Sequence, residues 1–150
     1  MKILEYPNEI LRKKSIEVKN PTSVKTKQLI LDMIQTLRAN NGLGLAAPQI
    51  GKNLRICIIE IENELFVLIN PEIKNLSKDE LLSEEGCLSF PNKFLNIPRR
   101  KRVKVKATDL NGKKQLIRAK GLLARAIQHE IDHLNGVLIV DRVVDDEQIN

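Results

Sequence analysis

Residues 121–136 read GLLARAIQHEIDHLNG and have the periodicity of a single helix. Four side chains recur at intervals of three or four residues, which places them along one face: Leu122, Ala126, His129 and His133. The neighbouring row consists of Leu123, Ile127, Glu130 and Leu134. Only one narrow row is clearly polar: Arg125, Gln128 and Asp132. A helix with so wide an apolar arc is expected to be central in its fold and to pack on more than one side.

This helix contains an H-E-x-x-H pattern. His129 and His133 lie one helical turn apart, so both imidazoles can reach one cation, and Glu130 would then lie beside a metal-bound water. The competing interpretation is two buried histidines with a purely structural role. These two are, however, the only histidines in 150 residues, and both fall in the motif. The pattern therefore favours a metal site.

A catalytic site of this kind normally uses three protein ligands, and the third must be a cysteine or a carboxylate. Ile139 stands where a longer form of the motif would place a third histidine. Cys57 lies in a β-rich apolar run and is interpreted as a small buried hydrophobe. Cys87, flanked by Gly86 and polar residues, is better suited to act as a thiolate. A carboxylate would favour a zinc peptidase of another substrate class, and the acidic tail offers four: Asp141, Asp145, Asp146 and Glu147.

The rest of the chain predicts one domain, residues 1–150, with an α+β fold. Short, mainly antiparallel strands would pack around the central metal-binding helix. A second helix is expected from Ser23 to about Ala39. Two hairpins are expected. One joins the β-rich runs 54–61 and 64–69 through a turn at Glu62-Asn63, and the other joins 102–109 and 115–119 through a turn at Asn111-Gly112. Residues 74–84 are predicted to be an exposed loop and residues 137–140 a short buried strand.

The net charge of +6 raises the question of a polyanionic partner. Apart from residues 99–102, the Lys and Arg residues are spread along the chain without aromatic residues to stack bases, so solvated surface charge is the preferred interpretation. A non-enzymatic basic binding module remains an alternative, and attraction to an RNA-rich surface such as the ribosome is compatible with the charge. No signal peptide or membrane span is expected, and two cysteines are typical of a cytoplasmic protein.

Residues 42–49 read GLGLAAPQ and contain almost no side-chain bulk. Such a stretch allows a backbone to approach closely, either in tight core packing or around a ligand. A phosphate loop is disfavoured because no Lys-Ser or Lys-Thr pair follows. From composition alone, Gln49 is interpreted as a turn residue.

Three motifs in this order resemble the peptide deformylase family: residues 42–49, residues 85–89 (EGCLS) and residues 128–133 (QHEIDH). The resemblance covers nearly the whole chain, from Tyr6 to Asp141. It implies a metallo-hydrolase that removes the formyl group from the N-terminal methionine of newly made polypeptides. It assigns Cys87, His129 and His133 as ligands of one metal ion, commonly Fe2+, with Zn2+, Ni2+ or Co2+ able to occupy the site.

The resemblance also implies roles for further residues. Glu130 would act as general acid and base, and the Gln49 amide and the Leu88 backbone N–H would stabilise the oxyanion, which reverses the turn interpretation of Gln49. Glu85 and Arg99 would form a supporting ion pair. Four residues would contact the substrate: Leu43, Gly44, Leu122 and Ala126.

The sequence departs from the family pattern in two places. One affects contacts with the substrate chain beyond its methionine, and the other affects contact with the ribosome. Lys93 and Phe94 stand in the loop after the cysteine motif, where some relatives carry an arginine that holds the substrate chain. The chain ends at Asn150, so we expect it to lack the long C-terminal helix that can serve ribosome contact in relatives. The resemblance implies N-formyl-methionyl nascent peptides as the substrate, and proximity to the ribosome is expected without contact through such a helix.

Overall fold

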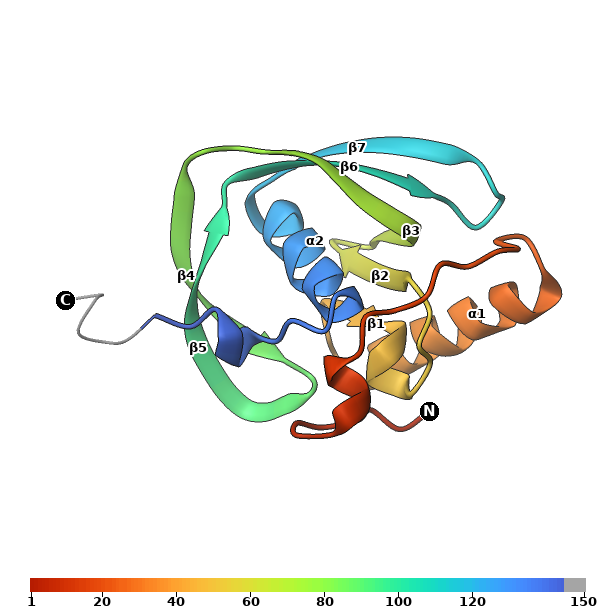
Figure 1. The fold of residues 1–150 in the computed structure, drawn as a ribbon, viewed down its shortest axis with the longest axis horizontal. Helices are drawn as coiled ribbons and strands as arrows, with labels where there is room; N and C mark the ends of the chain where they lie inside the picture. Colours follow the sequence, from red (N-terminus) through yellow and green to blue (C-terminus); the bar gives the residue numbers. More distant parts are fainter. Residues whose placement is uncertain (145–150) are drawn as a thin grey trace.

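The computed structural model describes residues 1–144 (Figure 1). Its strands are β1 (Gly44–Ala46), β2 (Ile56–Ile61), β3 (Glu64–Leu76), β4 (Glu80–Cys87), β5 (Phe90–Arg100), β6 (Arg102–Thr108) and β7 (Lys114–Lys120). Its helices are α1 (Val24–Ala39) and α2 (Gly121–Leu134), with short 3-10 helices η1 (Glu9–Arg12), η2 (Ala47–Ile50) and η3 (Ile139–Asp141). Among these residues, no helix is long and apolar enough to span a membrane.

Strands β1, β2, β3, β6 and β7 form one sheet in the order β1-β2-β3-β6-β7, and all its pairs are antiparallel. The predicted turn at Glu62 and Asn63 is confirmed, with positive φ angles of 51° and 65°, as a two-residue hairpin turn requires. Gly112, with φ of 80°, lies in the turn between β6 and β7. Strands β4 and β5 pair separately and form a curved arm at the left of Figure 1.

The two α-helices cover opposite faces of β2. Ile56 and Ile58 join a core cluster with Ile30, Met33 and Leu37 of α1. Cys57 and Ile59, which point the other way, join a second cluster with four residues of α2: Ala124, Ile127, Ile131 and Leu134. Because both faces of β2 are buried, its sequence is a continuous apolar run rather than an alternating one. Helix α2 also contacts β1, β5, β6 and β7, so it packs against strands of both sheets.

The predicted α+β fold with mainly antiparallel strands is confirmed, but three local predictions are wrong. Lys93 and Phe94, expected in a loop, lie in β5. Residues 74–84 are not a loop, because they form the end of β3 and most of β4. Most of these side chains are exposed, so the strands lack the apolar alternation that would have revealed them. Residues 137–140 are not a strand. Leu138 and Ile139 are buried with Leu11, Phe90 and Ile97, and this packing needs no sheet pairing.

Candidate metal centre and substrate groove

Helix α2 positions the two histidines and the glutamate of the motif. The rings of His129 and His133 lie 5.0 Å apart, one turn from each other on the same side of the helix. The helix stops at Leu134, and Gly136 follows with a positive φ of 72°, which suits glycine at a helix end. Both histidines are buried, and only the cysteine among the three candidate ligands is partly exposed.

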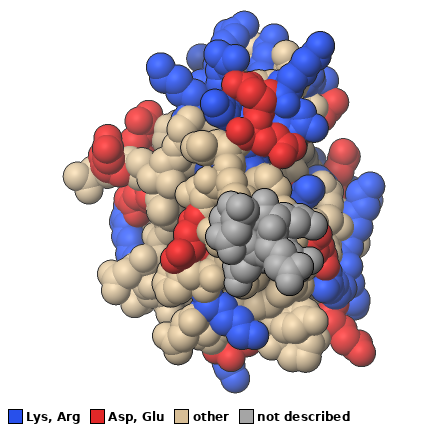
Figure 2. Space-filling model, turned by 90° about the vertical axis from the view of Figure 1, so that its left-hand side faces the viewer, with Lys and Arg blue, Asp and Glu red and all other residues tan. Residues whose placement is uncertain are grey.

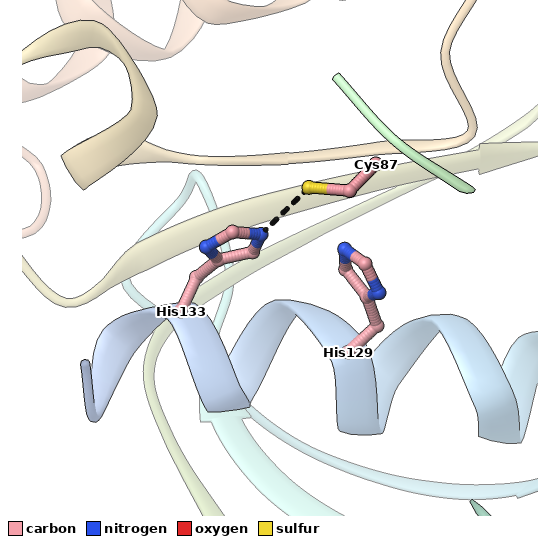
Figure 3. Close-up of side chains that lie close together, drawn as sticks. All are labelled: Cys87, His129 and His133. Atoms are coloured by element: carbon pink, nitrogen blue, oxygen red, sulfur yellow. Dashed lines mark hydrogen bonds between the residues drawn. The ribbon is translucent and has the colours of Figure 1, made fainter. Parts of the chain in front are cut away.

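Cys87 reaches the histidines from the end of β4. Its Sγ lies 3.3 Å from Nε2 of His133 (Figure 3), and the ligand atoms of Cys87, His129 and His133 all lie within 4.8 Å of one another. Metal–nitrogen and metal–sulfur bonds of about 2.0–2.3 Å allow one ion to contact all three atoms. Burial lowers the pKa of His133 well below its usual value, which favours the neutral imidazole that binds metals. One thiolate and two imidazoles fit a divalent transition metal.

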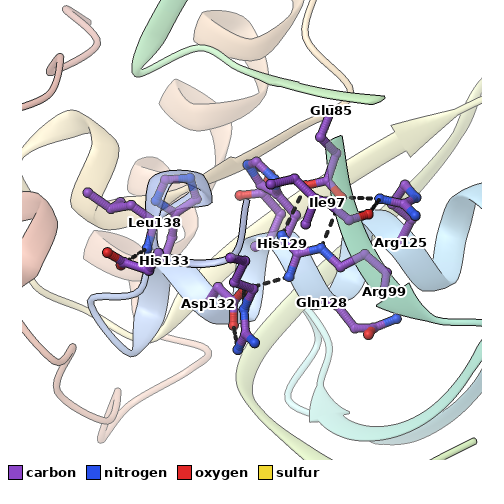
Figure 4. A network of polar contacts seen from close by, with 12 residues as sticks. Glu85, Ile97, Arg99, Arg125, Gln128, His129, Asp132, His133 and Leu138 are labelled. Atoms are coloured by element: carbon purple, nitrogen blue, oxygen red, sulfur yellow. Dashed lines mark hydrogen bonds and ion pairs between the residues drawn. The ribbon is translucent and has the colours of Figure 1, made fainter. Parts of the chain in front are cut away.

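A buried carboxylate contacts His129 at its ring nitrogen Nδ1. Oε1 of Glu85 lies 2.8 Å from Nδ1 of His129, while Arg99 donates two hydrogen bonds of 2.9 Å to the same carboxylate (Figure 4). Arg125 of α2 donates to Glu85 as well. Burial by itself raises the pKa of Glu85, but the hydrogen bonds from His129 and Arg99 outweigh it and lower the pKa to about 2. The Glu85–Arg99 pair named by the resemblance is thus present as a buried contact.

The network continues through Arg99 to the far side of the helix. Arg99 donates to Oδ2 of Asp132 at 2.5 Å, and Arg142 donates to both oxygens of Asp132. Gln128 accepts a hydrogen bond from the backbone N–H of Arg100 and donates to its carbonyl. The polar row of α2 therefore does not face solvent. Its hydrogen bonds and ion pairs join the helix to β5 and to the segment after η3.

Glu130 is buried and its carboxylate is only partly paired. Oε2 has no hydrogen-bond partner among the described residues, and Oε1 lies 3.9 Å from Nε2 of His129. Without a bound cation, burial raises the pKa of Glu130 to about 7. Gly44 of β1 lies directly against this side chain: a Cβ added there would be 2.6 Å from Oε1.

Gln49 is also held in place at this site. Its Oε1 accepts a hydrogen bond from the backbone N–H of Ala46, while Nε2 donates to Ser89 at 3.1 Å and lies 3.7 Å from Sγ of Cys87. The side chain is 1% exposed, so it is not a surface turn residue. Sequence reasoning gave Ser89 no role, although it stands in the EGCLS motif and is itself buried.

A groove of about 840 Å³ opens over these groups. The four residues expected to contact the substrate all line it, with Leu43 and Leu122 substantially exposed: Leu43, Gly44, Leu122 and Ala126. Gln49, Cys87, Leu88, His129 and Glu130 line it too. Sequence reasoning missed the N-terminal residues Met1, Lys2 and Ile3, which also line the groove and carry no motif that would have revealed them.

The other candidate ligands lie elsewhere. Cys57 is fully buried among apolar residues of β2, where burial raises the pKa of its thiol well above the usual value. Asp141 accepts hydrogen bonds from Arg12 and from the backbone N–H of Leu138. Asp145, Asp146 and Glu147 lie outside the described residues. Within residues 1–144, Cys87, His129 and His133 form the one His, Cys and carboxylate cluster compact enough for a metal.

Comparison with known proteins agrees with this geometry. The family model described as polypeptide deformylase matches residues 1–148. The peptide deformylase of Dictyoglomus thermophilum is 47% identical over 144 residues, covering 96% of this chain and 93% of the relative. That of Thermodesulfovibrio yellowstonii is 47% identical over 148 residues, covering 95% and 88%.

Solved structures give the same result. The crystal structure of peptide deformylase from Thermotoga maritima superposes with a TM-score of 0.93 at 40% identity, covering 96% of this chain and 97% of that chain. The Synechococcus elongatus peptide deformylase, in complex with actinonin, superposes with a TM-score of 0.94 at 41% identity, covering 100% and 82%. The chain therefore belongs to the polypeptide deformylase family.

Proposed function

We propose that this chain is a metal-dependent hydrolase that removes the formyl group from the N-terminal methionine of new polypeptides and releases formate. The observation that carries the proposal is the meeting of Cys87, His129 and His133 beside the carboxylate of Glu130, at a groove, in a chain of the polypeptide deformylase family. The peptidase alternative needed a carboxylate as third ligand. The proximity of Cys87 Sγ to both imidazoles argues against it.

One divalent metal ion would be held by Cys87, His129 and His133. When bound, it would supply a Lewis acid that lowers the pKa of water and polarises the formyl oxygen. We propose Fe2+ as the physiological ion because the resemblance of the sequence to peptide deformylases points to it. Zn2+, Ni2+ and Co2+ are alternatives, because a mixed thiolate and imidazole set can accept them as well. Glu85 supports this role, since it accepts a hydrogen bond from Nδ1 of His129 and leaves Nε2 free to bind.

Glu130 is proposed as the general acid and base. Its unpaired Oε2 is available to accept a proton from the attacking water, and the same oxygen can return that proton to the departing amine. A bound cation would pull its pKa down from the value set by burial, and so keep the resting carboxylate ionised at neutral pH. The walls of the groove, Gly44 among them, restrict the carboxylate to one region.

The Gln49 amide and the Leu88 backbone N–H are proposed to stabilise the oxyanion. Gln49 is supported in this role because the hydrogen bond from Ala46 to its Oε1 fixes the amide orientation and directs Nε2 toward Cys87. Donors held in place before reaction do not have to reorganise as charge develops. Ser89 would act through Gln49 by holding the same Nε2 group.

The substrate is proposed to bind along β1. In the sheet order, β1 is an edge strand that pairs with β2 on one side, so Leu43 and Gly44 can present backbone groups to an extended peptide as an added strand. Leu122 and Ala126 of α2 would contact the methionine side chain.

We further propose that residues 1–150 act as a single catalytic domain in the cytoplasm, on nascent chains near the ribosome.

The test is formate release from formyl-Met-Ala-Ser by anaerobically purified protein, beside Glu130→Ala, with metal content assayed in both. Activity in the parent that is lost in the variant, while the metal stays bound, is the expected result. A parent that is inactive with both iron and zinc would overturn the proposal. A Cys87→Ala variant that retains full metal content would instead support a different ligand set.

A further inference from the structure

The outer face of the β6–β7 hairpin carries a row of basic side chains. On β6 the inward residues Val103, Val105 and Ala107 are buried in the core. The alternate positions therefore point outward, as the two-residue period of a strand requires. Six outward positions of the two strands are Lys or Arg: Arg102, Lys104, Lys106, Lys114, Arg118 and Lys120.

The strand register places like charges directly opposite one another. Arg102 pairs with Lys120, and Lys104 pairs with Arg118. Like charges at directly opposed positions of an antiparallel pair destabilise the sheet, whereas opposite charges stabilise it. Two consecutive cross-strand pairs of the same sign are therefore an arrangement that a bound anion would relieve.

The four residues of these two pairs line a groove of about 530 Å³: Arg102, Lys104, Arg118 and Lys120. Asn75 and Ser77 line it too, and no acidic residue does. Among residues 1–144, no ion pair involves Lys104, Arg118 or Lys120, while Arg102 has only a distant carboxylate, Asp79 at 3.9 Å. Figure 2 shows Lys and Arg side chains gathered at the top of the molecule, the end at which β6 and β7 lie in Figure 1, with a group of Asp and Glu side chains among them. The positive charge of this groove is therefore largely uncompensated.

A second cleft, of about 290 Å³, continues this surface toward the substrate groove. Arg102 and Lys120 line both clefts. Arg100 and Lys101 add to the second cleft, which Asp79 also lines. Arg125 of α2 lines this second cleft and also the substrate groove. The basic surface thus adjoins the groove in which the peptide would be processed.

We propose that the outer face of β6–β7 binds the phosphate backbone of RNA without regard to sequence. Successive outward residues of a strand repeat at about 7 Å, so a row of cations can follow a row of phosphates. The face has no aromatic residue to stack bases, which leaves the backbone as the recognised feature. Leu116 is the one large apolar side chain exposed on these two strands, too little for insertion into a lipid surface.

The test compares the metal-loaded full chain with Lys104→Glu/Arg118→Glu. Binding of two fluorescent single-stranded RNAs of unrelated sequence is measured by anisotropy over a series of salt concentrations. The matched control is Lys13→Glu/Lys14→Glu, which changes the charge equally on exposed residues next to η1. We expect both RNAs to bind alike, the β6–β7 variant to bind at least tenfold more weakly, and the control to bind like the parent. Loss of two phosphate contacts should reduce the slope of log K against log salt by about 1.4.

A single Lys104→Glu variant gives a second readout. It places a carboxylate opposite Arg118, so its thermal midpoint should rise while its RNA affinity falls. A destabilised fold could not produce that combination. Equal weakening by the β6–β7 and η1 variants would overturn the proposal. A parent that binds phosphatidylserine vesicles but no RNA would also overturn the proposal, and so would a parent that binds neither vesicles nor RNA.

Discussion

Oε1 of Glu85 lies 2.8 Å from Nδ1 of His129, and both groups are buried. Glu85 belongs to β4 and His129 to α2, so this contact joins the two elements that supply the candidate metal ligands. Arg99 and Arg125 hold the carboxylate from its other sides. The tautomer and the orientation of His129 are therefore fixed by a charge network rather than by the ion alone.

Replacing this carboxylate by an amide should weaken metal binding. In Glu85→Gln the acceptor that orients His129 loses its charge, and loss of such a partner typically costs about 10- to 100-fold in metal affinity. The measurement is a competition titration with a chromogenic chelator. Glu84→Gln, at the exposed neighbouring position of β4, is the matched control and should bind metal like the parent.

The same carboxylate should control stability in acid. Its pKa is about 2 in the folded chain and near 4.5 when unfolded, so its contribution is complete above pH 4.5 and is lost as the pH falls toward 2. The full shift corresponds to roughly 3 kcal/mol. Urea unfolding of the metal-free chain across this range should show stability falling with pH. In Glu85→Gln the dependence should be visibly flatter, and an unchanged slope would exclude Glu85 as its source.

Gly44→Ala should impair catalysis while sparing the metal. A Cβ at this position would lie 2.6 Å from Oε1 and 2.9 Å from Cδ of Glu130, so the carboxylate must move. Displacing a catalytic group by about 1 Å can cost on the order of 100-fold in rate. We expect a drop in kcat for formate release with full metal content. A normal kcat would mean that the position of Glu130 is less critical than proposed.

Gly136→Ala should destabilise the fold without touching the site directly. Its φ of 72° strains any other residue, and an added Cβ would collide with the backbone carbonyl of Arg12. Backbone strain alone costs about 1–3 kcal/mol, and the collision adds to it. The loss should appear in the urea midpoint of metal-free protein. Gly121→Ala is the matched control, because Gly121 has a similar φ of 62° but no atom within 4 Å of an added Cβ, so it reports backbone strain without the collision.

Much of this protein follows from local sequence. The period of residues 121–136 predicted α2, and the spacing of His129 and His133 predicted one shared ligand direction, because helix geometry alone places such residues on one side. The turns at Glu62-Asn63 and Asn111-Gly112 likewise marked two hairpins by chain geometry. Local rules did not reveal β4, because an exposed two-stranded arm needs no apolar alternation.

The partners of each site residue were decided by tertiary structure. Composition made Gln49 a turn residue, and only the fold shows it buried with its amide held between Ala46, Ser89 and Cys87. The row of Arg125, Gln128 and Asp132 could have faced water, but β5 and the segment after η3 lie over it. The sequence by itself determined which residue types can bind a metal and which elements carry them. Only the packing of β4, β1 and α2 decided that Cys87 lies beside the histidines, rather than Cys57 or a carboxylate of the described residues. The physical reason is that contacts between distant segments depend on the whole core and not on local periodicity.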